Sequence, residues 1–357
     1  MRLNELTCSG FRCLGELQFL PIPGVNIVHG RNAQGKTSLL EAAYFAVTSK
    51  SHRTNTESEL VRHNHDRFQI RAEVARRDRE VRIEVNWWQG TKRIKVNHVA
   101  LSRVSDLLGR ANIIFFSPED IALIQGAASV RRRFFDMEMA QLQPSYLAAL
   151  QQYRQVLRQR NQLLRQPTPD LPQLEAWDEP LARHGAVLIE ERRKFLRDLA
   201  PLATRAYAHI APDEPVEIRY HPDVPDAAAL PKTLLKARNS DLRQGVTNRG
   251  PHRDDFEVYV SGKPARIFAS QGQQKTAALA LRLAEIELVH DRTREYPILM
   301  LDEVMAELDA ARAERLLDSI HPDVQCVLTT TNLNASLPSA QRASAHFLMQ
   351  GGRLETR

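Results

Sequence analysis

The feature that most constrains this chain is an eight-residue stretch near its start, Gly30-Arg31-Asn32-Ala33-Gln34-Gly35-Lys36-Thr37. It fits the pattern G-x-x-x-x-G-K-[ST] of the phosphate-binding P-loop. Such a loop needs glycine at both ends, because the backbone must wrap around a phosphate and point its N–H groups inward. Residues 25–29 predict a short buried strand before the loop, and residues 38–44 predict a helix after it. A chance glycine turn is a weaker interpretation of this combination.

The side chains at the end of the loop predict specific roles. Lys36 would neutralise charge on the β- and γ-phosphates of a nucleotide, and the Thr37 hydroxyl would bind Mg²⁺. The N-terminus of the following helix would face the phosphates. The predicted nucleotide-binding residues are therefore Gly30, Arg31, Asn32, Ala33, Gln34, Gly35, Lys36, Thr37 and Ser38.

Bulk composition narrows the class of protein. The 357 residues suffice for two or three domains, and 43% apolar with 26% charged residues describe a soluble globular protein. A net charge of +6 permits an anionic partner such as nucleic acid without demanding one. Cys8, Cys13 and Cys326 lack zinc-site spacing, which favours buried thiols in a reducing, cytoplasmic compartment. No apolar stretch of about 20 residues predicts a membrane-spanning helix.

The N-terminal third predicts a mixed sheet. Residues 3–8, 14–20 and 25–29 favour strands, alternating apolar residues over 68–74, 81–85 and 93–96 predict an antiparallel meander, and the apolar run 111–116 is typical of a buried parallel strand. The basic residues of the meander predict a solvated face, with a DNA-facing sheet as the alternative. Arg12, at the first turn, is equally consistent with a nucleotide-phosphate contact and a solvated turn.

The middle of the chain predicts helices. Apolar residues recur at three- and four-residue spacing over 146–164 and 181–207, and the proline-rich stretch 166–172 separates them. This pattern predicts a helical hairpin. Its basic residues favour either solvated helix faces or phosphate contacts, and they are Arg131, Arg132, Arg133, Arg154, Arg158, Arg192, Arg193 and Lys194. Strands follow at 216–220 and 258–260, and the polar cluster 250–256 between them is an ordered turn or a nucleotide contact.

Two later motifs would complete a nucleotide site. Ser270-Gln271-Gly272-Gln273 precedes a helix predicted over 277–290, so Ser270, Gly272 and Gln273 suit a γ-phosphate, although serine is also an ordinary helix N-cap. The apolar strand 297–301 ends in Asp302 and Glu303, the Walker B pattern. Asp302 would hold Mg²⁺ and Glu303 would act as the general base. A core strand that ends in an acidic turn fits less well after two upstream motifs. The predicted catalytic residues are Glu303, Lys36 and Asp302, and the metal ligands are Thr37 and Asp302.

The motif order resembles the ATP-binding-cassette ATPases, and within them the SMC-like DNA-repair branch. Three stretches narrow the resemblance to the RecF family of bacterial replication and repair proteins. They are Pro118–Gly126 through Arg131, Arg132 and Asp136; Gly250-Pro251-His252-Arg253; and Ser270–Thr276. There are departures. Ala128 stands where that family usually has proline, Gln125 or Glu119 is the candidate for the Q-loop role, and Thr330 and Thr331 stand in place of a switch histidine.

The resemblance implies an α/β fold: a P-loop ABC-type ATPase head with a mixed sheet, and a mainly helical second lobe that carries the hairpin. Residues 1–118 would form the N-terminal half of the ATPase lobe, 119–245 the helical lobe, and 246–357 the signature helix and Walker B half. Strand 324–331 would end in hydroxyls near the γ-phosphate.

The resemblance also implies cofactors and partners. ATP with Mg²⁺ would join two copies head to tail, with Ser270 of one copy on the γ-phosphate bound by the other. Slow, DNA-stimulated hydrolysis would release the dimer. DNA, either double-stranded, gapped or at single-strand junctions, would bind through its phosphates, and RecR with RecO would help to load RecA. No membrane partner is implied.

Three other functions remain as alternatives. A transporter's nucleotide-binding subunit would carry Leu-Ser-Gly-Gly-Gln and a switch histidine, and both are absent. An SMC-type tether would need a much longer coiled coil than this hairpin. A nucleotide-dependent scaffold without hydrolysis is disfavoured by Glu303.

Overall fold

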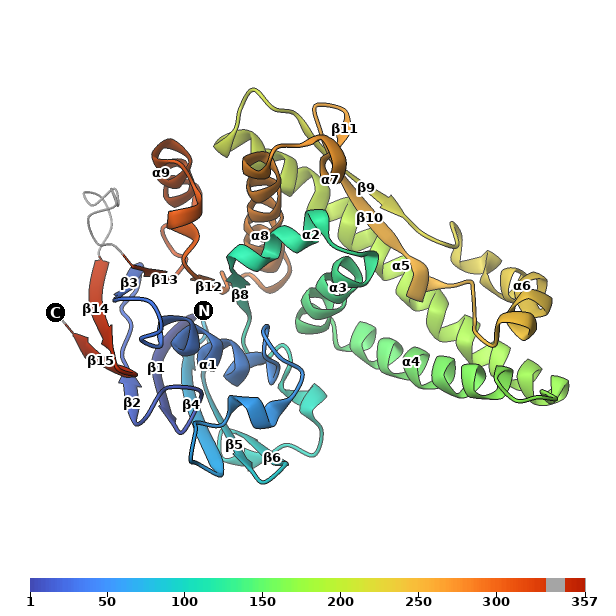
Figure 1. Cartoon of the computed structure of the whole chain (residues 1–357), viewed down its shortest axis with the longest axis horizontal. Helices are drawn as coiled ribbons and strands as arrows, with labels where there is room; N and C mark the ends of the chain where they lie inside the picture. Colours follow the sequence, from blue (N-terminus) through green and yellow to red (C-terminus); the bar gives the residue numbers. More distant parts are fainter. Residues whose placement is uncertain (332–343, 357) are drawn as a thin grey trace. The chain divides into compact units, whose positions relative to one another are not determined.

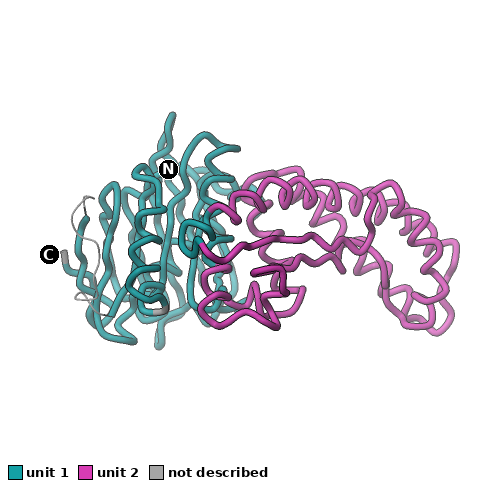
Figure 2. The backbone as a smooth tube through the Cα atoms, turned by 90° about the horizontal axis from the view of Figure 1, so that it is seen from above, with its two compact units in different colours: residues 1–120, 206–212, 279–357 teal, residues 121–205, 213–278 magenta. Residues whose placement is uncertain are grey.

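The computed structural model describes residues 1–331 and 344–356. Figure 2 shows its two compact units in different colours: unit 1 contains residues 1–120, 206–212 and 279–357, and unit 2 contains residues 121–205 and 213–278. The predicted boundary after residue 118 lies two residues from this division, whereas residues 246–278, predicted to belong to the ATPase lobe, cluster with unit 2. These units are defined by compactness, so the functional division into three segments stays a prediction.

Unit 1 contains a mostly parallel sheet in the order β15-β14-β3-β13-β12-β8. Its strands are β3 (Val25–His29), β8 (Ile113–Phe116), β12 (Ile298–Leu301), β13 (Cys326–Thr330), β14 (Ser344–Gln350) and β15 (Arg353–Thr356). Every residue of β3, β8, β12 and β13 is buried, as expected for parallel strands covered on both faces. Parallel pairing brings the carboxyl ends of these four strands to one edge, so the P-loop, Asp302 and Thr330 meet there.

A second sheet of unit 1 is antiparallel, in the order β2-β1-β4-β5-β6-β7. Its strands are β1 (Arg2–Ser9), β2 (Leu17–Phe19), β4 (Arg67–Ala75), β5 (Glu80–Trp88), β6 (Thr91–Val96) and β7 (Val99–Ala100). Buried and exposed residues alternate along β4 and β5, which confirms the predicted meander. On the polar face, Arg71 lies opposite Glu84, and Glu84 lies opposite Lys95. This alternation of charge favours the solvated face over a DNA-facing sheet.

Helix α1 (Lys36–Thr48) packs against β4 and β5 of the antiparallel sheet and against β8 and β13 of the parallel sheet (Figure 1). All of its residues except Thr37 are buried. Packing on both sides explains why residues all around this helix are buried. Unit 1 also contains α9 (Ala310–Ser319) and most of α8 (Gln271–Thr293).

Unit 2 is mainly helical. It contains α2 (Ala122–Gln125), α3 (Ala128–Leu142), α4 (Pro144–Leu164), most of α5 (Leu171–Ile210), α6 (Leu230–Gln244), α7 (Ala265–Phe268) and the sheet of β9 (Val216–His221), β10 (Asp255–Val260) and β11 (Lys263–Pro264). The predicted hairpin is α4 and α5, but α5 begins ten residues before the predicted position 181. Pro172 fits a first turn, which needs no N–H donor there, and tertiary packing of the fully buried Leu174 and Leu181 outweighs the cost of Pro180 inside the helix.

Candidate nucleotide site and the motifs around it

The P-loop has a backbone that only small residues tolerate at its ends. Gly30 has φ 154° and Gly35 has φ 112°, while Ala33 adopts the left-handed conformation with φ 61°. A Cβ atom at Gly30 would lie 2.3 Å from the carbonyl oxygen of Met349. Glycine at position 30 is therefore required both by the backbone angle and by the close approach of β14.

The loop leaves the N-terminus of α1 available to an anion. Gly35 is the N-cap residue, no side chain caps the helix, and its first turn contains no acidic residue. The first N–H groups of the helix, together with its dipole, therefore suit a phosphate.

The turn between β14 and β15 holds the loop in place. The N–H of Gly351 donates to Oε1 of Gln34 over 2.7 Å, and the N–H of Gly352 donates to the backbone oxygen of Gln34 over 2.9 Å. We did not predict these two glycines as part of the site. The Gly-Gly pair itself was the only local indication of a special turn.

Lys36 is buried, with 4% of its side chain exposed. Its Nζ donates to the carbonyl oxygens of Gly30 and Arg31 at 2.7 and 3.0 Å, and it forms an ion pair with Oε1 of Glu303 at 2.9 Å. These three contacts occupy the three donors of the ammonium group. A γ-phosphate oxygen that bound Lys36 would therefore replace one of them.

Asp302 accepts two hydroxyl hydrogen bonds. Thr37 Oγ1 donates to Oδ1 of Asp302 over 3.0 Å, and Thr329 Oγ1 donates to the same oxygen over 2.7 Å. Burial raises the pKa of Asp302, and the two hydroxyl groups oppose that shift. Mg²⁺ prefers oxygen ligands and needs only one or two from the protein when a nucleotide supplies others, so Thr37 and Asp302 fit this ion. The described residues contain no cluster of three or more His, Cys, Asp or Glu side chains able to hold a metal ion.

Glu303 has an unusual backbone, in the left-handed region at φ 54°. Its N–H donates to Thr329 Oγ1 over 2.9 Å, and its side chain is 26% exposed. Such strained backbone is concentrated at functional sites. Thr329 thus holds both Asp302 and Glu303. We predicted hydroxyls at the end of this strand but emphasised Thr330 and Thr331, so the residue with these contacts was missed by one or two positions.

The signature motif begins in residues assigned to unit 2, whereas the P-loop belongs to unit 1. Ser270 and Gln273 form a capping box at the start of α8. The Gln273 N–H donates to Ser270 Oγ over 3.2 Å, and the Ser270 N–H donates to Gln273 Oε1 over 2.8 Å. The ordinary capping role is therefore present. Ser270 is also exposed, and Gly272 adds no side chain to the first turn, so both residues leave room for a phosphate. The contact itself stays a prediction.

Two of the stretches that resemble RecF family signatures are joined inside unit 2 through Arg192. Arg192, only 2% exposed, donates to Asp136 Oδ1 and Asp254 Oδ2 at 2.9 Å each and to the carbonyl oxygen of Pro251 at 2.5 Å. Arg131, also buried, contacts both oxygens of Asp255 at 2.6 and 2.8 Å. Both predictions for Arg131 and Arg192, solvated face or phosphate contact, are wrong, because these buried cations form ion pairs with carboxylates of unit 2.

Contacts within the chain bear on three other open interpretations, and the Q-loop role of Gln125 or Glu119 stays a prediction. The cluster 250–256 is an ordered turn, in which His252 contacts Tyr153 Oη at 2.6 Å and the carbonyl oxygen of Thr247 at 2.9 Å. Arg12 is not a solvated turn residue, because it contacts the buried carboxylate of Glu41 on α1 at 2.8 Å. Gln125 donates to Gln274 in α8 over 2.6 Å, whereas Glu119 accepts from Ser117.

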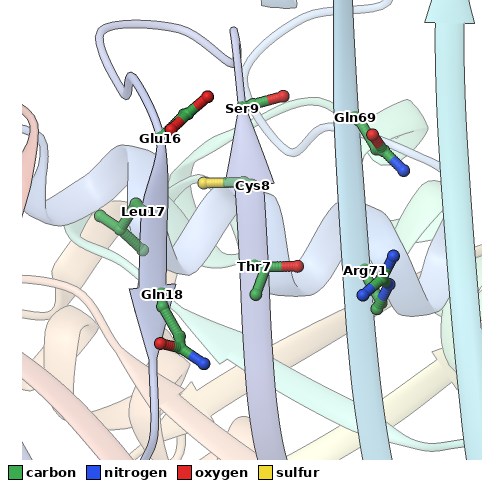
Figure 3. Close-up of a pocket in the computed structure, with 8 residues that line it drawn as sticks. All are labelled: Thr7, Cys8, Ser9, Glu16, Leu17, Gln18, Gln69 and Arg71. Carbon is green, nitrogen blue, oxygen red and sulfur yellow. The ribbon is translucent and has the colours of Figure 1, made fainter.

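A polar hollow of about 470 Å³ lies on the antiparallel sheet (Figure 3). Residues of β1, β4 and the start of β2 line it, including Thr7, Gln18 and Arg71. None of the predicted nucleotide-binding residues contributes to this lining. Among the residues with described positions, no helix is long and apolar enough to cross a membrane.

Comparisons with known proteins agree with the motifs. A family model described as the RecF/RecN/SMC N terminal domain matches residues 2–352. The chain is 42% identical over 348 residues to the DNA replication and repair protein RecF of Lactobacillus acidophilus, which covers 93% of both chains. It is 37% identical over 347 residues to RecF of Oceanobacillus iheyensis, which covers 93% of this chain and 94% of that protein. This chain belongs to the RecF family.

Solved structures extend the likeness to the fold of the RecF family. A structure of the recombination mediator protein RecF-ATP in the RecFOR pathway matches with a TM-score of 0.90 at 33% identity, over 99% of this chain and 97% of that chain. The corresponding RecF-ATPrS structure also has a TM-score of 0.90, at 32% identity, over 99% and 98%. An Smc head bound to the C-winged helix domain of ScpA matches at 16% identity with a TM-score of 0.60, over 100% of this chain and 97% of that chain, which concerns the fold alone. The predicted fold class, an ABC-type ATPase head with a helical lobe, is confirmed.

Proposed function

We propose that this chain is an ATP-dependent DNA-binding protein of recombinational repair and replication restart at single-strand gaps. One observation carries the proposal. Lys36, Thr37, Asp302 and Glu303 come from two distant parts of the chain and meet in one hydrogen-bonded group at the carboxyl edge of the parallel sheet. The similarity to the RecF-ATP structure supports ATP as the nucleotide.

The chemistry follows from the positions of these groups. The P-loop backbone and Lys36 would bind the phosphates, and Thr37 with Asp302 would hold Mg²⁺, which neutralises phosphate charge when bound. Glu303 would accept a proton from the attacking water as the general base. Because Glu303 contacts Lys36 at 2.9 Å, it becomes available for this role only when that ion pair opens. Because hydrolysis requires the Lys36–Glu303 ion pair to open first, the site fits a weak, DNA-stimulated ATPase that acts as a switch.

The signature motif would act on a second copy of the chain. Ser270 is exposed at the N-terminus of α8, where a hydroxyl and backbone N–H groups suit a γ-phosphate. We infer a symmetric head-to-tail dimer with two ATP molecules, in which Ser270, Gly272 and Gln273 of each copy contact the nucleotide of the other. Hydrolysis would remove the bridging γ-phosphate and release the dimer.

DNA and the recombination machinery are the proposed partners. Double-stranded and gapped DNA would bind largely through phosphates, so affinity should fall with salt. RecR, with RecO and the RecA pathway, is proposed from the family and from the RecFOR pathway of the similar structures. The runner-up function is the nucleotide-binding subunit of a transporter. It is disfavoured because this chain has neither the transporter form of the signature nor the switch histidine.

The test combines dimerisation with DNA binding. Light scattering with and without ATP, and binding to gapped duplex, would be measured for the wild type, Lys36→Ala, Ser270→Arg and Glu303→Gln. Lys36→Ala and Ser270→Arg should lose the ATP-induced dimer, whereas Glu303→Gln should keep it longer. Lys232→Ala, at an exposed lysine of α6, is the control and should behave as the wild type. A wild type that stays monomeric with ATP, and whose DNA affinity ignores nucleotide, would overturn the mechanism.

A further inference from the structure

Helix α4 of unit 2 lies in a long stretch of the chain without acidic residues. Residues 139–169 contain no aspartate or glutamate, although they include Arg154, Arg158, Arg160 and Arg165. One side of α4 is buried and apolar, apart from the ion-paired Arg160. The exposed side consists largely of glutamine and arginine, at Gln151, Gln152, Arg154, Gln155, Arg158, Gln159 and Gln162, with Arg165 directly after the helix. We call this set the arginine–glutamine face.

The exposed arginines form a line along this face. At about 100° per residue, positions 154, 158 and 165 fall within about 40° of one another around the axis. At about 1.5 Å per residue, they extend over about 16 Å along it. The intervening glutamines add neutral donors and acceptors without adding negative charge. The result is a linear array of donors that suits a regularly repeated anion.

Several exposed basic side chains of the neighbouring helix α5 have acidic partners. Arg193 contacts Glu190, Lys194 contacts Glu191 and Arg197 contacts Asp198. The antiparallel sheet alternates its charges in the same way. By contrast, the side chains of Arg158 and Arg165 form no hydrogen bond or ion pair with any residue that the structure describes, and only Arg154 has a carboxylate, Asp136, at 2.5 Å. On a helix face that contacts only solvent, acidic neighbours would stabilise the helix through such ion pairs.

We propose that the arginine–glutamine face of α4 binds the phosphate backbone of double-stranded DNA. The proposal rests on the proposed function and names the surface that would carry it. Arginine and glutamine are common donors to phosphate oxygens, and such contacts hold a protein on a duplex without reading its sequence. Single-stranded DNA is a poorer fit, because its binding sites stack bases on exposed aromatic rings, and the two tyrosines of α4, Tyr146 and Tyr153, are buried.

The test changes charge without touching the nucleotide site. Affinity for a blunt duplex, with ATP present, would be measured from about 50 to about 200 mM salt for the wild type and for Arg158→Gln/Arg165→Gln. Two lost phosphate contacts should lower the slope of log affinity against log salt by about 1.8 for each bound copy, and should weaken binding about 10- to 100-fold at moderate salt. Gln155→Glu/Gln162→Glu, which adds two carboxylates to the same face, should also weaken binding.

The matched control is Lys232→Gln/Lys236→Gln, which removes two exposed cations four residues apart on α6. All variants should keep the wild-type ATP-induced dimer and thermal stability. If the α4 variants match the control in affinity and slope while the wild type binds duplex, the proposed surface is wrong and the proposed function stands. If the wild type does not bind duplex under any nucleotide condition, both fail.

Discussion

The ion pair between Lys36 and Glu303, the proposed general base, predicts that a neutral variant of Glu303 will bind ATP more tightly, independently of any effect on hydrolysis. In the structure, Glu303 Oε1 lies 2.9 Å from Lys36 Nζ, which is the group expected to bind the β- and γ-phosphates. ATP must therefore open this pair and place its own negative charge close to the Glu303 carboxylate. Glu303→Gln removes the negative charge but keeps an amide oxygen that can accept a hydrogen bond from Lys36.

The magnitude follows from the geometry of the pair. At 2.9 Å, two unit charges attract by about 6 kcal/mol at an effective dielectric constant of about 20, but the cost of desolvation offsets most of this. Glu303 is 26% exposed, which screens the pair further. A charge-assisted hydrogen bond contributes about 1.5–3 kcal/mol net, and the amide retains part of it. We therefore expect a gain of about 1–2 kcal/mol in ATP binding, which is about 5- to 30-fold in Kd.

The assay is equilibrium binding of ATP in excess chelator, so that neither Mg²⁺ nor hydrolysis contributes. Titration calorimetry would compare the wild type with Glu303→Gln, Glu303→Asp and Glu314→Gln. Glu303→Asp keeps the charge and should stay close to the wild type. Glu314→Gln makes the same chemical change at an exposed position of α9 and should have no effect. If Glu303→Gln binds ATP no better than Glu314→Gln, the ion pair does not compete with the nucleotide, and the reasoning is refuted.

Three further predictions concern stability. Arg192→Met leaves the carboxylates of Asp136 and Asp254 buried without their cation, so the free energy of unfolding of unit 2 should fall by about 3–5 kcal/mol. Urea unfolding would be followed by the fluorescence of Trp177 in a Trp87→Phe/Trp88→Phe background. A loss below about 1 kcal/mol would contradict the network. The pKa of His52 is lowered to about 4, chiefly by burial. Between about pH 6.5 and about pH 4, His52 therefore binds a proton more tightly in the unfolded chain than in the folded one, so stability should fall as the pH drops through this range. His52→Phe, which can still stack on Phe115, should remove up to about 3 kcal/mol of that pH dependence, and an unchanged pH profile of thermal unfolding would disprove the assignment. Gly30→Ala should abolish ATP binding and lower the melting temperature, because its Cβ would lie 2.3 Å from the Met349 oxygen; normal ATP binding would show that the loop has room to move.

Local patterns predicted the elements that depend on local causes. The strand 25–29 was predicted at both ends, because a short segment rich in Val and Ile directly before a glycine loop leaves few alternatives. The start of α5 was missed, because the penalty for proline was weighed without the packing that compensates for it at Pro180. Helix α8 also begins earlier than predicted, at Gln271, since Ser270 and Gln273 cap it.

The basic residues of unit 2 mark where sequence reasoning failed. Arg131 and Arg192 are buried, whereas Arg158 and Arg165 are exposed, yet all four stand in helical stretches of similar composition. Helical spacing places a residue on a face, but it does not say whether a carboxylate from another element will meet it. The partners of Arg192 come from α3 and from the turn before β10, and no local pattern joins these segments.

The sequence by itself determined the P-loop, the Walker B end of a buried strand, the order of motifs and therefore the ATPase fold, because each depends on neighbouring residues and on repeating periods. Only the tertiary structure decided which groups pair. It joined Thr37 to Asp302 across 265 positions and Gly351 to Gln34 across 317. It also placed Glu303 against Lys36 and gave Thr329 the contacts expected of its neighbours. The physical reason is that hydrophobic periodicity is a local property of the sequence, whereas a hydrogen bond between strands requires the register and order of the sheet, which the chain settles only when it is folded.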